Sequence, residues 1–91
     1  MKKSIRLFLS GTVQPMFFAP YIKQEADKLG LRGYVRNLED KRIEVFIEGD
    51  IKVVDEMIPK CRTGPYNTKI RSVEQKDERF QDFKDFRIMN I

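Results

Sequence analysis

The apolar residues near the start of the chain follow a period of two. The positions that carry this pattern are Ile5, Leu7, Leu9, Gly11 and Val13. Their neighbours are mostly polar, and such alternation indicates a strand with one buried face. Beyond them the period changes to three and four, at Phe18, Ile22, Ala26 and Leu29. This second pattern predicts an amphipathic helix that Gly30 ends.

A hairpin and a second helix follow. Residues 31–37 and a segment around Val45 again alternate, and the polar residues 38–41 between them predict a turn. Asp50 is a natural N-cap for the next helix. The inner stripe of that helix is Val54, Met57, Ile58 and Cys61. Pro59 falls in its expected last turn, where it should loosen or end the helix, and Gly64-Pro65 is a firm break.

The last third of the chain predicts two further strands. Ile70 and Val73 support a strand over residues 68–74, and their spacing of three predicts a bulge. The charge-rich residues 76–85 are expected to form a loop or a loosely held hairpin, and residues 86–91 a short final strand.

The element order is therefore β-α-β-β-α-β with one extra strand. This order predicts an α+β ferredoxin-like sandwich, in which an antiparallel sheet carries both helices on one face. No linker, repeat or shift in composition divides the 91 residues, so we expect a single domain over residues 1–91. The fold hosts enzymes, RNA binders and regulatory domains, and it does not decide the function.

Composition excludes several kinds of chemistry. The net charge of +4 is spread along the chain, which favours a solvated surface over a focused anion-attracting field. Cys61 is the only cysteine and there is no histidine, so the chain has no internal disulfide, no zinc site and no histidine-activated nucleophile. We expect Cys61 to be a buried thiol. No apolar run approaches the roughly 20 residues of a membrane span, and no signal peptide is visible, so we expect a cytoplasmic protein.

The segment between the first strand and the first helix carries the most specific pattern. It reads Gly11-Thr12-Val13-Gln14-Pro15-Met16-Phe17-Phe18-Ala19. This stretch resembles the signature loop of the acylphosphatase family, which reads roughly G-x-V-Q-G-V-x-F-R. The resemblance continues through Gly30-Leu31-Arg32-Gly33-Tyr34-Val35-Arg36-Asn37, and then through Asp40, Glu48-Gly49, Gly64-Pro65 and Phe86-Arg87-Ile88.

The resemblance implies an activity and a site. Members of the family hydrolyse acyl phosphates without a metal or an organic cofactor, so the implied ligand is a small acyl phosphate or a phosphate anion. By resemblance, Asn37 orients the attacking water, and Gln14, Pro15, Met16, Phe17, Phe18 and Ala19 form the phosphate-binding loop. Independently, free N–H groups and the positive end of the dipole at a helix N-terminus suit a phosphate. Phe17 and Phe18 also fit simple core packing, and Asn37 also fits a turn position.

Two residues depart from the family pattern. Ala19 stands where the family has the Arg that grips phosphate, and Pro15 stands where it has Gly. Ala19 supplies no guanidinium, and Pro15 and Pro20 supply no N–H, so we expect impaired catalysis. Lys23 is the candidate substitute cation, because it lies one helical turn after Ala19 and helical side chains lean toward the N-terminus. Arg36 should face away from Asn37, since neighbouring strand residues point to opposite faces.

Other functions stay open. The principal alternative is a pseudoenzyme, a non-catalytic module that binds an anion or a protein on the same fold, and no sequence feature identifies a protein partner. RNA binding is the least favoured, because only Tyr34 and Phe46 could form a stacking platform on the strands. No membrane partner is expected.

Overall fold

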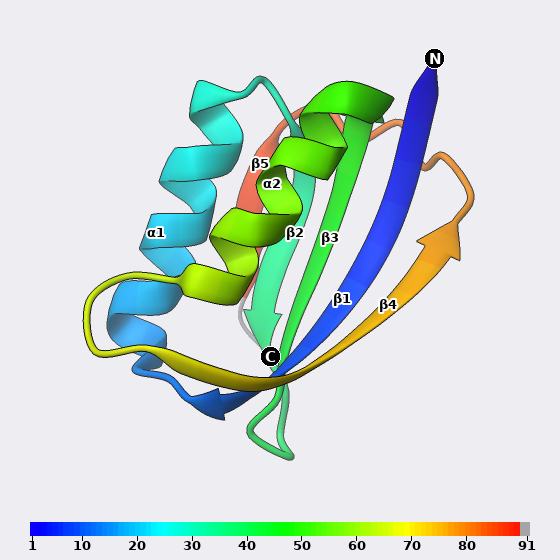
Figure 1. The fold of residues 1–91 in the computed structure, drawn as a ribbon. Coiled ribbons are helices and arrows are strands. Elements are labelled where there is room, and N and C mark those ends of the chain that lie inside the picture. Colours follow the sequence, from blue (N-terminus) through cyan, green and yellow to red (C-terminus); the bar gives the residue numbers. More distant parts are fainter. Residues whose placement is uncertain (90–91) are drawn as a thin grey trace.

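A computed structural model describes residues 1–89 of the protein. These residues form five strands and two helices, whose arrangement Figure 1 shows. In order they are β1 (Lys2–Thr12), α1 (Pro15–Lys28), β2 (Arg32–Asn37), β3 (Ile43–Asp50), α2 (Ile51–Thr63), β4 (Lys69–Glu78) and β5 (Phe86–Met89). The strands make one sheet in the order β4-β1-β3-β2-β5, and both helices lie on the same face of it. This is the expected α+β ferredoxin-like sandwich.

The sheet is mixed, whereas the sequence predicted an antiparallel one. Strands β1 to β4 pair antiparallel, but β5 pairs parallel with β2, with Gly33 opposite Phe86. The reason is the path of residues 79–85. They cross from the β4 edge to the β2 edge at the end where β2 begins, so β5 then runs in the same direction as β2 (Figure 1). Residues 90 and 91, which were predicted to belong to this strand, lie outside the described residues.

β4 is longer than predicted. It extends to Glu78, which pairs with Ser4, so the first part of the expected loop at 76–85 is strand. The eleven-residue β1 makes this possible, because its edge offers backbone partners along its length. The predicted bulge is confirmed: Ser10 faces Ser72 while Gly11 faces Ile70, which leaves one extra residue on β4.

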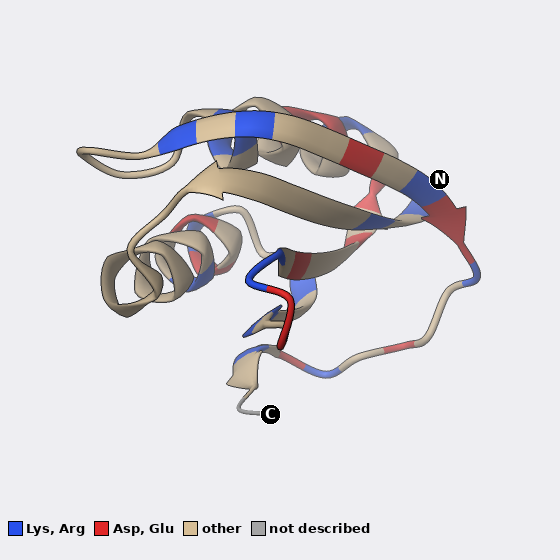
Figure 2. Cartoon of the chain, turned by 90° about the horizontal axis from the view of Figure 1, so that it is seen from below, with Lys and Arg blue, Asp and Glu red and all other residues tan. Residues whose placement is uncertain are grey.

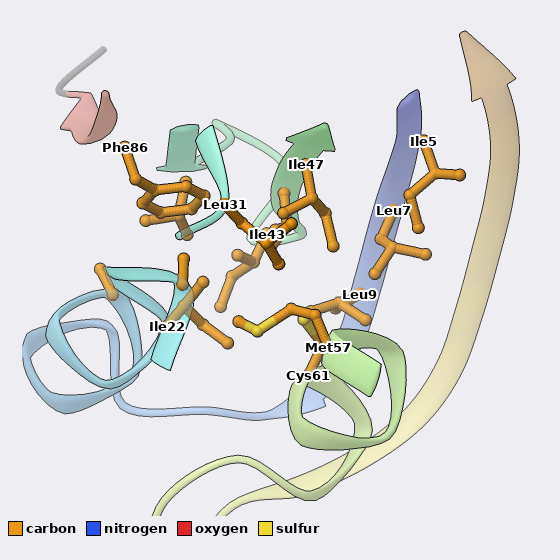
Figure 3. Close-up of a cluster of buried hydrophobic side chains, with 14 of the residues drawn as sticks. Ile5, Leu7, Leu9, Ile22, Leu31, Ile43, Ile47, Met57, Cys61 and Phe86 are labelled. Carbon is orange, nitrogen blue, oxygen red and sulfur yellow. The ribbon is translucent and has the colours of Figure 1, made fainter. Parts of the chain in front are cut away.

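The core lies between the helices and the sheet. Ile5, Leu7 and Leu9 from β1 are fully buried, as the alternation predicted. Figure 3 shows them with side chains of α1 and α2 that point toward the sheet. Each buried aliphatic or aromatic side chain stabilises the fold by about 1.5–3 kcal/mol. The helical members of this core are Phe18, Ala19, Ile22, Ala26, Val54, Met57 and Cys61.

The two helical prolines lie inside their helices, which for Pro59 corrects the expectation that it falls in the last turn and loosens or ends the helix. Pro59 does not end α2, which continues to Thr63, and Pro20 lies beyond the first turn of α1. Each proline removes the hydrogen bond to the carbonyl four residues earlier, at Asp55 and Met16. All four of these residues are exposed, so water can bind the freed carbonyls and the helices continue.

The N-cap of α2 is confirmed. A carboxylate oxygen of Asp50 accepts a hydrogen bond from the Lys52 N–H at 3.0 Å. We expect Asp50→Ala to lower the free energy of unfolding by about 1 kcal/mol, because this helix donor then loses its partner. Urea titration would measure the change, and Asp50→Ser should restore most of the loss because serine also caps helices. Equal stability of the alanine variant and the native protein would contradict this role.

Candidate functional site

The end of β1, the start of α1 and the end of β2 meet at one end of the molecule (Figure 1). A hollow of about 340 Å³ lies there. We call it the Asn37 hollow, and its lining residues are Gly11, Val13, Pro15, Asn37, Leu38, Lys41 and Ile43. The structure thus brings Asn37 to the same hollow as the strand–helix junction, although the two are far apart in the sequence.

Asn37 is the last residue of β2 and is half-buried. It lies on the same face of the strand as the buried Val35, which is the face that the helices cover. Its side chain makes no hydrogen bond to another described residue. The carboxamide therefore has a free donor group and a free acceptor, both of which can bind water or a phosphoryl oxygen.

The start of α1 offers few free donors. Gln14 is the N-cap, and the N–H groups of Phe17 and Phe18 both donate to its carbonyl oxygen at 2.9 Å. Pro15 has no N–H. Within the described residues, Met16 therefore carries the one N–H of the first turn without a protein acceptor. The expected binding loop is in fact mostly helix, since Pro15–Lys28 is α1.

The two phenylalanines of this segment have different environments. Phe18 is fully buried in the core, whereas Phe17 is 57% exposed. Phe17 lines a second hollow of about 350 Å³ on this end of the molecule, together with Gln14, Pro65, Tyr66 and Asn67. With Met16 and Tyr66 also exposed, the start of α1 presents an apolar surface.

Ala19 belongs to the core. It is only 5% exposed, and no charged residue occurs in α1 before Lys23. Figure 2 views the molecule from this end, where the first turns of α1 carry no charge colour. The helix start therefore offers an anion main-chain dipoles but no charged side chain.

Lys23 and Arg36 are both engaged elsewhere. The Lys23 ammonium donates to Asp27 at 2.8 Å, one turn further along α1 and away from the hollow. The Arg36 guanidinium donates to Glu44 on the helix-free face of the sheet, as the strand alternation predicted. The geometry therefore disfavours Lys23 as the substitute cation.

Lys41 is the cation that does line the Asn37 hollow, and sequence analysis did not single it out. It belongs to the turn between β2 and β3, where acidic residues are followed by Lys41 and Arg42 (Figure 2). The signal that could have found it is its place four residues after Asn37, in a turn that folds back toward the same end of the sheet.

The helix-free face of the sheet is covered in part by residues 79–85, which we call the strap. Phe83 of the strap packs on Phe46 and Tyr34, with ring centroids 5.4 and 5.7 Å away. Phe46 is only 1% exposed, so the aromatic pair expected as an RNA platform is not open. Burial and the hydrogen bond to Glu44 raise the pKa of Tyr34 to about 12.

A buried carboxylate fastens this strap to the sheet. Glu48 is 1% exposed, and it accepts hydrogen bonds from the N–H groups of Gln81 and Phe83 at 2.7 and 2.6 Å. It also accepts from the Ser4 hydroxyl at 3.0 Å. Residues 79–85 are therefore a loop, which is one of the two predicted alternatives, and the carboxylate of Glu48 fixes this loop to the sheet.

Other chemistry is not supported by the described residues. Burial raises the pKa of the Cys61 thiol to about 12, so it stays protonated and unreactive at neutral pH. No group of His, Cys, Asp or Glu suited to a metal ion occurs in residues 1–89. No helix of that range is long and apolar enough to cross a membrane.

The family model and the similar curated proteins point to one family. The family model described as acylphosphatase matches residues 5–88. An acylphosphatase of Alkalilimnicola ehrlichii is 39% identical over 89 residues, which is 98% of this chain and all of that protein. One from Rubrobacter xylanophilus is 40% identical over 76 residues, covering 84% of this chain and 69% of that protein. The crystal structure of acylphosphatase from Bacillus subtilis superimposes with a TM-score of 0.90 at 27% identity, covering 98% of this chain and 99% of that one.

Proposed function

This chain belongs to the acylphosphatase family, and from that premise we propose that it hydrolyses acyl phosphates slowly, with water oriented by Asn37. We take residues 1–91 as one domain that needs no metal or organic cofactor. The observation that carries the proposal is the Asn37 side chain, which has no hydrogen bond to another residue of the range 1–89 and lines a hollow beside the start of α1. We place the protein in the cytoplasm, where a single unpaired cysteine is ordinary.

The reaction transfers a phosphoryl group to water. The water oxygen forms a new bond to phosphorus, while the bond between phosphorus and the acyl oxygen breaks. A carboxylate and dihydrogen phosphate leave, and both protons of the water stay on the phosphate. Such transfers depend mostly on positioning and on stabilising charge on the phosphoryl oxygens.

Asn37 and the α1 N-terminus have complementary roles in this scheme. The carboxamide oxygen of Asn37 accepts a hydrogen bond from the water, and its NH₂ group donates to a phosphoryl oxygen. The Met16 N–H and the positive end of the α1 dipole bind the same phosphoryl group. Holding the water and the phosphorus in line lowers the entropic part of the barrier.

The rate is expected to be low because the anion is held weakly. Ala19 supplies no guanidinium, and Pro15 supplies no N–H. A missing transition-state donor of this kind costs about 10²–10³ in rate. We therefore expect slow turnover, with most of the site geometry kept.

Asn37→Ala tests the assignment. We expect it to reduce kcat for acyl phosphate hydrolysis by about 10²-fold, because the water loses its orienting group. Thermal stability should change little, since the Asn37 side chain has no hydrogen bond in the described residues. Hydrolysis would be followed by loss of the acyl phosphate with no added metal, and Ser72→Ala on the exposed part of β4 is the control. Unchanged turnover in Asn37→Ala would show that the site is elsewhere.

The second candidate is a non-catalytic module that binds an anion or a protein. The exposed apolar side chains at the start of α1 and in the neighbouring loop after α2 favour it, since Met16 is 77% exposed and Tyr66 91%. A native protein without hydrolysis, whose turnover Ala19→Arg does not restore, would support this alternative. RNA binding remains the least favoured, because the Phe46 ring is covered.

A further inference from the structure

Resting on the proposed function, we propose that Lys41 is the cation that holds the phosphoryl group in the Asn37 hollow. A phosphoryl group carries about two negative charges. At the start of α1, only main-chain dipoles are available to stabilise these charges. Lys23 is paired with Asp27, and Arg36 binds Glu44 on the other face of the sheet. Lys41 is the cationic residue that lines the hollow with Asn37.

The turn fixes the backbone of Lys41 beside Asn37. The Lys41 N–H donates to the Leu38 carbonyl at 3.0 Å, and the Leu38 N–H donates to the Arg42 carbonyl at 2.8 Å. These two bonds close the hairpin directly after β2, of which Asn37 is the last residue. The start of the Lys41 side chain is therefore held at the hollow, and only its flexible stem must be ordered on binding.

The Lys41 ammonium is free to bind a ligand. The adjacent Asp40 is taken by Arg42, whose backbone N–H and Nε donate to its two carboxylate oxygens at 3.1 and 2.7 Å. Lys41 is exposed, and within residues 1–89 it has no ion pair. Its charge is therefore not neutralised by the acidic half of its own turn.

The backbone conformation of Lys41 suits glycine better than lysine. Its φ is 72°, in the left-handed region where glycine is favoured and a lysine costs stability. Lys41→Gly should therefore leave the fold as stable as the native protein or more stable, and it should weaken anion binding. If Lys41 had only a structural role, Lys41→Gly would not weaken phosphate binding while it kept or raised stability.

Binding of inorganic phosphate provides the test, because it does not depend on turnover. Amide shifts of ¹⁵N-labelled protein would be followed during a phosphate titration at fixed low salt, with thermal melting on the same samples. We expect Lys41→Gly to raise the Kd for phosphate about tenfold, the equivalent of one charge-assisted hydrogen bond. Lys41→Arg should keep the affinity, since a guanidinium binds phosphate at least as well.

Two further variants sharpen the result. Lys52→Ala removes the same charge from the start of α2, at the opposite end of the sheet, and should leave the Kd unchanged (Figure 1). Lys23→Ala should also leave it unchanged. The inference is overturned if Lys41→Gly binds phosphate like the native protein, if Lys23→Ala is the weaker binder, or if the native protein binds no phosphate.

These outcomes separate the inference from the proposed function. Hydrolysis that needs Asn37 but is indifferent to Lys41→Gly, in both KM and phosphate affinity, would support the function and refute the inference. Phosphate binding that needs Lys41, in a protein without hydrolysis, would support the cation site and refute the enzyme.

Discussion

Ala19→Arg is expected to raise the rate of acyl phosphate hydrolysis by about 10²–10³, which is the usual effect of one strong transition-state donor. A guanidinium binds phosphoryl oxygens through a planar fork and carries a permanent charge. Helical side chains lean toward the N-terminus of their helix, so an arginine at this position extends toward the start of α1 and the Asn37 hollow.

Because Ala19 is buried, Ala19→Arg needs a control variant of similar size and no charge. It is 5% exposed and belongs to the core, so a long side chain must displace neighbours or follow the helix surface outward. Ala19→Met introduces comparable bulk without charge and should not raise turnover. Steady-state kinetics and thermal melting of both variants would separate a gain in catalysis from a loss of packing.

A failure of Ala19→Arg to raise the rate would identify a different cause of slow turnover. If Ala19→Arg is folded but no faster than the native protein, the missing guanidinium is not what limits the rate. Pro15 and the hydrogen bonds that Phe17 and Phe18 make to Gln14 would then be the cause, since they leave few N–H groups for an anion.

Glu48→Ala is expected to lower the free energy of unfolding by about 3–5 kcal/mol, because three donors lose a charged acceptor in a buried place. These donors are the Ser4 hydroxyl and the N–H groups of Gln81 and Phe83. The strap should then detach and expose Phe46 and Tyr34. Urea titration would measure the loss, and amide exchange at residues 79–85 would show whether the strap opens.

Two companion variants define the cause. Glu48→Gln keeps one acceptor oxygen and replaces the other with a donor, so its stability should lie between those of the native protein and Glu48→Ala. Glu74→Ala on the exposed part of β4 should change stability by no more than about 0.5 kcal/mol. Equal effects at Glu48 and Glu74 would show that the strap does not depend on the buried carboxylate.

The local pattern of apolar, polar and capping residues determined much of the secondary structure of this protein. Alternation at Ile5, Leu7 and Leu9 predicted the buried face of β1, and Asp50 marked the start of α2. The opposite orientations of Arg36 and Asn37 followed from the period of a strand alone. These features depend on a few neighbouring residues and on backbone geometry, so the sequence contains their cause. The resemblance to the family signature predicted that the start of α1 and Asn37 belong to the same site.

The remaining features were decided by tertiary structure. β5 runs parallel to β2 because the strap crosses the sheet before it, and Glu48 holds that strap through residues more than thirty positions away. Lys23 pairs with Asp27, and the hollow at Asn37 instead includes Lys41. The direction of a long side chain depends on which partner is nearest in space. The local periodicity of the sequence does not indicate that partner.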